Sequence, residues 1–101
     1  MSKHLIVTAD DFGLSSQVNA AVERAHRDGI LTAASLMVGA PAAAEAVAVA
    51  RRNPRLRVGL HLALVEARPA LPRSAVPDLV GPDGWFPVSY THLTLPTIYS
   101  V

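Results

Sequence analysis

Two adjacent aspartates, Asp10 and Asp11, come shortly after an apolar, β-branched run at residues 5–7. Adjacent carboxylates repel each other, and a metal ion or a shared proton can supply the counter-charge. Side chains alternate along a strand, so the two carboxylates should point in different directions and suit two roles better than one clamp. An Asx turn and helix-capping pair ahead of Gly13 is the alternative, and spacing alone leaves both interpretations open.

His61 is the third residue whose side chain could take part in catalysis or metal binding. It lies near the C-terminal end of an alternating segment at residues 56–64, on the face opposite the leucines. A neutral imidazole is a good zinc ligand, although a half-buried histidine bonded to a backbone carbonyl is the competing interpretation. A metal site typically needs a third protein ligand. His4 and His26 are poorly placed for that, so we expect this ligand beyond residue 87.

A β-α-β-α-β arrangement should position these residues. The predicted strands cover residues 5–7, 30–38 and 56–64, and the predicted helices cover residues 15–28 and 42–52. Right-handed crossovers make such strands parallel. In parallel α/β folds the site lies at the C-terminal ends of the strands. Asp10, Asp11 and His61 are therefore expected at one edge of one sheet.

Local signals mark the ends of the helices. Ser15 or Ser16 can cap the first helix by accepting a backbone N–H bond, and Gly29 suits the left-handed position after its last turn. Asn53-Pro54 ends the second helix, because proline disfavours helix in the residue before it. Beyond Glu66 the chain is proline-rich and should form a long excursion. Three strands and two helices cannot close a barrel or cover both faces of a sheet, which indicates a truncated α/β fold.

Composition excludes several classes of protein. The 101 residues carry 9 Lys+Arg and 8 Asp+Glu, and this balance gives no reason to expect nucleic acid as a partner. The absence of Cys excludes disulfide scaffolds and thiol nucleophiles. No apolar run approaches the length of roughly 20 residues that a transmembrane segment needs. With no signal-peptide pattern at the start, we expect a cytoplasmic protein.

The C-terminal segment has a different character. No charged residue occurs after Asp83. Residues 88–97 resemble, codon by codon, a translated sequencing-library adapter, and its continuation through Val101 would end in a stop codon. A short strand with a period of two is the alternative. We expect residues 1–87 to be the N-terminal part of a longer protein and residues 88–101 to be a non-native tail, so His92 enters no functional argument.

The residues suggest three other functions. A receiver-like phosphoacceptor module also opens with an acidic pair that binds magnesium, but it needs Asp where this chain has His61. A glycosidase needs two carboxyl groups about 5 to 9.5 Å apart, and adjacent residues seldom converge that way. A non-catalytic fragment is the third, and it is compatible with an enzymatic parent protein.

Three segments together carry a family resemblance. Residues 5–13 (LIVTADDFG), 29–38 (GILTAASLMV) and 58–62 (VGLHL), with Asn19 between the first two, resemble the YdjC-like carbohydrate deacetylases. Residues 26–29 (HRDG) and 64–69 (LVEARP) fit the branch associated with hopanoid biosynthesis, typified by HpnK. The resemblance covers about residues 3–87.

The resemblance implies a distorted (β/α) barrel, similar to a TIM barrel, and removal of an N-acetyl group from an amino-sugar or glycolipid substrate. It implies a divalent metal, Mg or Zn, held by an Asp-His-His set. Asp11 and His61 would be two of the ligands, and Asp10 the general base or its immediate support. The third ligand belongs to a downstream motif, so the fragment itself should be inactive. The parent protein is compatible with a homodimer.

Overall fold

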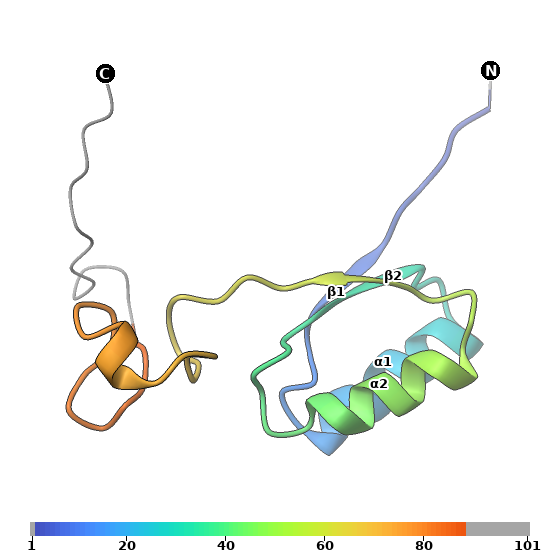
Figure 1. Ribbon diagram of the computed structural model, residues 1–101. Coiled ribbons are helices and arrows are strands. Elements are labelled where there is room, and N and C mark those ends of the chain that lie inside the picture. The colour runs from blue at the N-terminus through green and yellow to red at the C-terminus, as the bar shows by residue number, and fades with distance from the viewer. Residues whose placement is uncertain (1, 89–101) are drawn as a thin grey trace. The chain divides into compact units, whose positions relative to one another are not determined.

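The computed structural model describes residues 2–88 (Figure 1). The chain divides into two compact units, with the boundary between Leu62 and Ala63. The N-terminal unit contains β1 (Thr8–Phe12), α1 (Ser16–Asp28), β2 (Ala33–Leu36), α2 (Ala43–Arg52) and β3 (Arg57–Leu60). The predicted β-α-β-α-β order is therefore confirmed. Residues 89–101, which include His92 and most of the adapter-like segment, lie outside the described residues.

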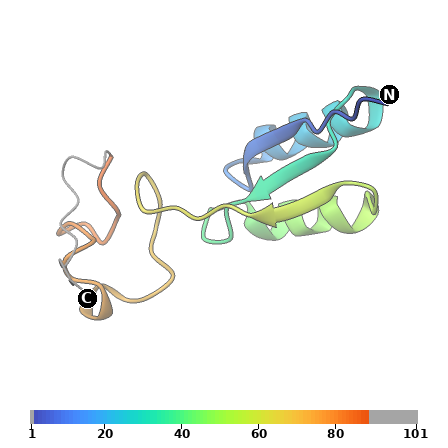
Figure 2. The same cartoon turned by 90° about the horizontal axis from the view of Figure 1, so that it is seen from above.

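The three strands form one parallel sheet in the order β1-β2-β3. Both helices lie on the same side of this sheet (Figures 1 and 2). Two right-handed crossovers that step in the same direction produce this arrangement. Within the N-terminal unit, residues 2–62, no helix lies on the opposite side of the sheet. An α/β unit of this kind is the N-terminal portion expected of a (β/α) barrel.

The core lies between the two helices and the sheet. Its buried members are Phe12, Val22, Leu31, Ala34, Ala46, Val49 and Leu56. Phe12 from β1 and Val49 from α2 are almost completely shielded from solvent. These apolar side chains recur at helical spacing on α1 and α2 and pack against the face of β1 and β2 that carries Phe12 and Ala34.

Strand β1 begins later than predicted. The apolar run at residues 5–7 was expected to be the strand, but Leu5 and Ile6 are 73% and 77% exposed and β1 starts at Thr8. Strand pairing requires a partner, and the first residue of β2, Ala33, pairs with Thr8. Asp10 and Asp11 consequently lie within the strand, rather than in a loop after it.

Ser15 and Gly29 explain where α1 begins and ends. The Ser15 hydroxyl accepts a hydrogen bond from the Val18 N–H at 3.1 Å, which confirms Ser15 as the N-cap. The left-handed conformation predicted for Gly29 is wrong, because its φ is −130°. Glycine is needed there for space, since a Cβ atom would lie 2.7 Å from the carbonyl oxygen of Ala25.

An ionic cluster joins the two helices. Glu23 of α1 accepts two hydrogen bonds from the guanidinium of Arg52 at 2.7 and 2.9 Å, and a third from the Asn53 amide at 2.6 Å. Arg27 donates to the side-chain oxygen of Asn53 at 2.9 Å. The hydrogen bonds that Glu23 accepts from Arg52, first, and from Asn53 lower the pKa of Glu23 from 4.5 to about 2.

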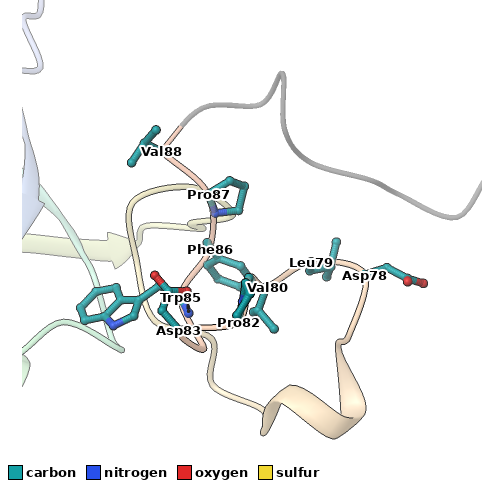
Figure 3. A pocket seen from close by; sticks show the side chains of 10 residues that line it. Asp78, Leu79, Val80, Pro82, Asp83, Trp85, Phe86, Pro87 and Val88 are labelled. Carbon is teal, nitrogen blue, oxygen red and sulfur yellow. Dashed lines mark hydrogen bonds between the residues drawn. The ribbon is translucent and has the colours of Figure 1, made fainter.

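The second unit matches the predicted proline-rich excursion. Its one short helical turn among the described residues is η1 (Arg73–Ala75). The Glu66 N–H donates to the Pro87 carbonyl at 2.9 Å and the Phe86 N–H to the Ala67 carbonyl at 3.0 Å, which closes the excursion into a loop. Residues 78–83 and 85–88 line a hollow of about 490 Å³, and Figure 3 shows the side chains that line it. The Arg68 guanidinium lies 4.4 Å from the centre of the Trp85 ring, so a cation already occupies one face of that indole.

Candidate active site

A β-bulge places the two adjacent aspartates. Ala9 pairs with Ala34 of β2, but Phe12 pairs with Leu36, so β1 holds one residue more than β2 over this stretch. Ala9 and Phe12 both pack in the core beneath the helices. Asp11 adopts a φ of +61°, a left-handed conformation that Asp tolerates better than most residues. The extra residue bends the strand locally, as bulges near functional sites often do.

The bulge overturns the expectation that the two carboxylates diverge. Strict alternation would have put Asp10 and Asp11 on opposite faces. Instead, Oδ1 of Asp10 accepts a hydrogen bond from Ser35 at 3.0 Å, and Ser35 lies 3.3 Å from Nδ1 of His61. Oδ1 of Asp11 lies 3.7 Å from that same Nδ1 atom. Both carboxylates therefore belong to one cluster.

His61 follows β3 directly and extends its pairing with β2. Its backbone N–H donates to the Leu36 carbonyl at 2.9 Å, one position beyond the last strand pair. In the sheet register Ser35 is opposite Gly59, so the side chain of His61, two residues later, is on the same face as Ser35. The His61 side chain is 25% exposed and that of Asp11 is 54% exposed. The cluster is thus open to solvent at the C-terminal edge of the sheet.

The cluster contains more acceptors than protons. The Asp11 backbone N–H points at Nδ1 of His61 from 3.4 Å, which requires a lone pair on that nitrogen. The Ser35 hydroxyl has one proton and donates it to Asp10. Carboxylate oxygens of Asp10 and Asp11 and a ring nitrogen of His61 are thus gathered around one hydroxyl and one backbone N–H. A cation is the group that such a donor set suits.

The donor atoms also fit a divalent metal in type and spacing. Carboxylate oxygen and imidazole nitrogen are both zinc ligands, and two ligands of a tetrahedral zinc ion lie about 3.4 Å apart. The 3.7 Å between Asp11 and His61 is close to that separation. Within residues 2–88, however, no three His, Cys, Asp or Glu side chains are grouped so that they could hold an ion. The described residues thus supply part of a coordination set.

A buried asparagine holds the two loops beside the site. Asn19 of α1 is fully buried. Its Oδ1 accepts from the Gly13 N–H at 2.8 Å, and its Nδ2 donates to the Ala42 carbonyl at 3.0 Å. The Ala42 N–H in turn donates to the Gly13 carbonyl at 2.9 Å. This clamp joins the loop after β1 to the loop after β2.

Sequence reasoning missed Ser35 and Asn19 as residues of the site. Ser35 had one usable signal, a small polar residue near the end of the strand between the aspartates and His61. Asn19 had a weaker one, a polar residue within the apolar stripe of α1. Neither signal identifies a partner atom, so their roles emerge only from the distances.

The sequence of this chain is similar to those of known proteins. The family model described as YdjC-like protein matches residues 4–99. The chain belongs to the YdjC-like protein family. Its family relatives include carbohydrate deacetylases of Geobacillus stearothermophilus, 42% identical over 87 residues, and of Vibrio vulnificus, 45% identical over 82 residues. These matches cover 86% and 81% of this chain, but only 34% and 31% of the relatives.

A crystal structure of a similar protein supports the fold. This protein from Enterococcus faecalis, described as a candidate cellobiose-phosphate cleavage protein, superimposes with a TM-score of 0.77 at 39% identity. The superposition covers 81% of this chain and 33% of that one. The chain therefore spans about a third of the length of the relatives it matches, and its α/β unit corresponds to part of their fold.

Proposed function

We propose that this chain is the N-terminal part of a metal-dependent deacetylase that removes an N-acetyl group from an amino sugar. The observation that carries the proposal is the approach of Asp11 to His61, at 3.7 Å, with Asp10 beside them. The relatives named carbohydrate deacetylases support the choice of reaction.

Each residue of the cluster has a separate task in this proposal. Asp11 and His61 hold a divalent ion, Mg²⁺ or Zn²⁺. When bound, such an ion would polarise an amide carbonyl and lower the pKa of a bound water to about 7. Asp10 accepts the proton of the attacking water, because its second carboxylate oxygen is not engaged by Ser35. The acid that protonates the leaving amine is outside this set.

The third metal ligand is proposed to come from a part of the protein beyond residue 87. The relatives are about three times as long as this chain, which supports the proposal.

The exposure of Val58 and Leu60 also supports the presence of further native chain. They pair with Ala34 and Leu36 on the core side of the sheet, yet they are 40% and 61% exposed. We propose that further native chain covers them, that residues 88–101 are a foreign tail, and that the fragment alone is inactive.

A glycosylated hopanoid is the proposed substrate class, and the cytoplasm is the proposed location. The substrate proposal depends on the resemblance of residues 26–29 and 64–69 to the hopanoid-associated branch. None of the helices within residues 2–88 is long and apolar enough to cross a membrane.

The alternatives fare differently. A doubly wound receiver-like module has its first strand between the second and third, whereas here β2 is in the middle. The sequence-based objection to a glycosidase, that adjacent carboxyl groups seldom converge, does not hold, because the bulge brings both carboxylates to one cluster. Deacetylation is preferred over it because of the relatives' names and the histidine beside the carboxylates.

The test replaces His61 in the full-length protein. His61→Ala should abolish acetate release from N-acetylated amino sugars and lower the bound metal measured by elemental analysis. His4→Ala is the matched control, because His4 is exposed near the N-terminus. This control variant should leave acetate release and the amount of bound metal unchanged. Undiminished turnover by His61→Ala would remove His61 from the site and contradict the proposal.

A further inference from the structure

Ser35 lies at the centre of the candidate site, although its residue type alone does not mark it. Its hydroxyl donates to Oδ1 of Asp10 at 3.0 Å and lies 3.3 Å from Nδ1 of His61. It belongs to β2, the middle strand, while Asp10 is on β1 and His61 follows β3. Ser35 is therefore the residue that contacts both outer parts of the site.

The size of Ser35 matters because of where it stands. Neighbouring strands are about 4.8 Å apart, so the backbones of β1 and β3 are separated by roughly 9–10 Å. Asp11 and His61 nevertheless approach to 3.7 Å, on the face of β2 that carries Ser35. A large side chain at this position would occupy the space in which they meet.

The hydroxyl of Ser35 has a second effect. A carboxylate that accepts a bond at one oxygen is held in one orientation, and hydrogen bonds to charged groups are stronger than neutral ones. Because Ser35 occupies Oδ1 of Asp10, the carboxylate keeps Oδ2 for another partner. The strained backbone of the adjacent Asp11, with φ +61°, makes such a side-chain anchor useful in the bulge.

We propose that Ser35 is a positioning residue with two separable contributions. Its hydroxyl orients the Asp10 carboxylate for proton transfer, and its small size leaves room for Asp11 and His61 to reach one ion. The inference rests on the proposed roles of these three residues.

The hydroxyl is tested by kinetics of the full-length protein. Ser35→Ala should lower kcat about tenfold to a hundredfold, the loss expected for one hydrogen bond to a charged group, with KM within about twofold of the original. Ser35→Thr keeps the hydroxyl and should restore most of kcat. Ser16→Ala is the matched control, because Ser16 also donates to a carboxylate, that of Glu45 at 2.7 Å, but on the helices. A kcat of Ser35→Ala within twofold of the original overturns this contribution.

The size of the side chain is tested by metal binding without turnover. Zn²⁺ is titrated calorimetrically into the metal-free full-length protein. Ser35→Leu should bind Zn²⁺ at least tenfold more weakly, while Ser35→Ala binds within about threefold of the original. Equal affinity of Ser35→Leu and the original protein overturns the spatial contribution.

The two arms separate this inference from the proposed function. If the original protein binds Zn²⁺ but releases acetate from no amino sugar, the deacetylase proposal fails, and the titration with Ser35→Leu still decides the spatial claim. If the original protein is active and Ser35→Ala is equally active, the deacetylase proposal stands and the positioning claim for the hydroxyl fails.

Discussion

Asp11 lies in β1 and His61 directly follows β3, the two outer strands of a three-stranded sheet, and yet Oδ1 of Asp11 lies 3.7 Å from Nδ1 of His61. Three local features make this approach feasible. The bulge in β1 directs Asp11 to the face away from the core, β2 carries only a serine between them, and His61 extends the pairing of β3 by one position. The site is thus a consequence of the backbone register as much as of the residue types.

The two aspartates should respond differently to substitution. Asp11→Asn should weaken Zn²⁺ binding by the full-length protein, because an amide oxygen is a poorer ligand than a carboxylate for this ion. Asp10→Asn should keep the ion but lower kcat by about 10²- to 10⁴-fold, the contribution of a general base. Calorimetric titration and acetate release measure the two effects. Equal loss of metal in both variants would contradict the separation of roles.

Removing the buried asparagine clamp should destabilise the protein. Asn19→Ala leaves the Gly13 N–H and the Ala42 carbonyl without their partners, and each buried unsatisfied group costs about 1–3 kcal/mol. The free energy of unfolding, measured by urea denaturation, should fall by at least about 2 kcal/mol. Gln17→Ala removes an exposed amide from the same helix and should change the free energy of unfolding by less than about 0.5 kcal/mol. A loss for Asn19→Ala as small as that of the control would show that the clamp is not holding the loops.

Stability should depend on the protonation of Glu23 in acid. The pKa of this carboxyl is lowered in the folded protein from 4.5 to about 2 by its hydrogen bonds with Arg52 and Asn53. A lowered folded-state pKa means that its contribution is complete above pH 4.5 and is lost as the pH falls toward 2. Glu23→Gln should therefore show a weaker decline in the free energy of unfolding across this range. Urea denaturation at several pH values measures this free energy. An equal decline in both proteins would contradict the assignment.

The gene should continue in frame beyond codon 87. We expect DNA read across codons 87 and 88, from a library without this adapter, to replace residues 88–101 with native sequence that supplies a third metal ligand. The family match at residues 4–99 spans part of this segment, so the experiment has a clear alternative. If the codons for residues 88–101 are genomic and followed by a stop, the proposal of a foreign tail is wrong.

The order of elements could be predicted because it depends on local patterns. The apolar stripes of α1 and α2 and the cap at Ser15 are recorded in consecutive residues, and the right-handed crossover then makes the strands parallel. Family membership, which three short segments indicated, is likewise confirmed.

The bulge could not be predicted, because it is a relation between two strands. Nothing in Asp10-Asp11 itself reveals that Phe12, rather than Asp11, pairs with Leu36. The late start of β1 at Thr8 has the same origin, since an apolar run becomes a strand only where a partner is present. The contact of Ser35 with both Asp10 and His61 depends on this register. The roles assigned to Asp10, Asp11 and His61 stay predictions.

The central claim is that Asp11 and His61 hold one divalent ion. The most direct test is a crystal structure of the full-length protein grown with Zn²⁺, with the ion located by its anomalous scattering. We predict one strong anomalous peak within about 2.0–2.2 Å of a carboxylate oxygen of Asp11 and of a ring nitrogen of His61, with a third ligand from beyond residue 87. A Zn²⁺ ion bound elsewhere, with Asp11 and His61 free of metal, would contradict the account.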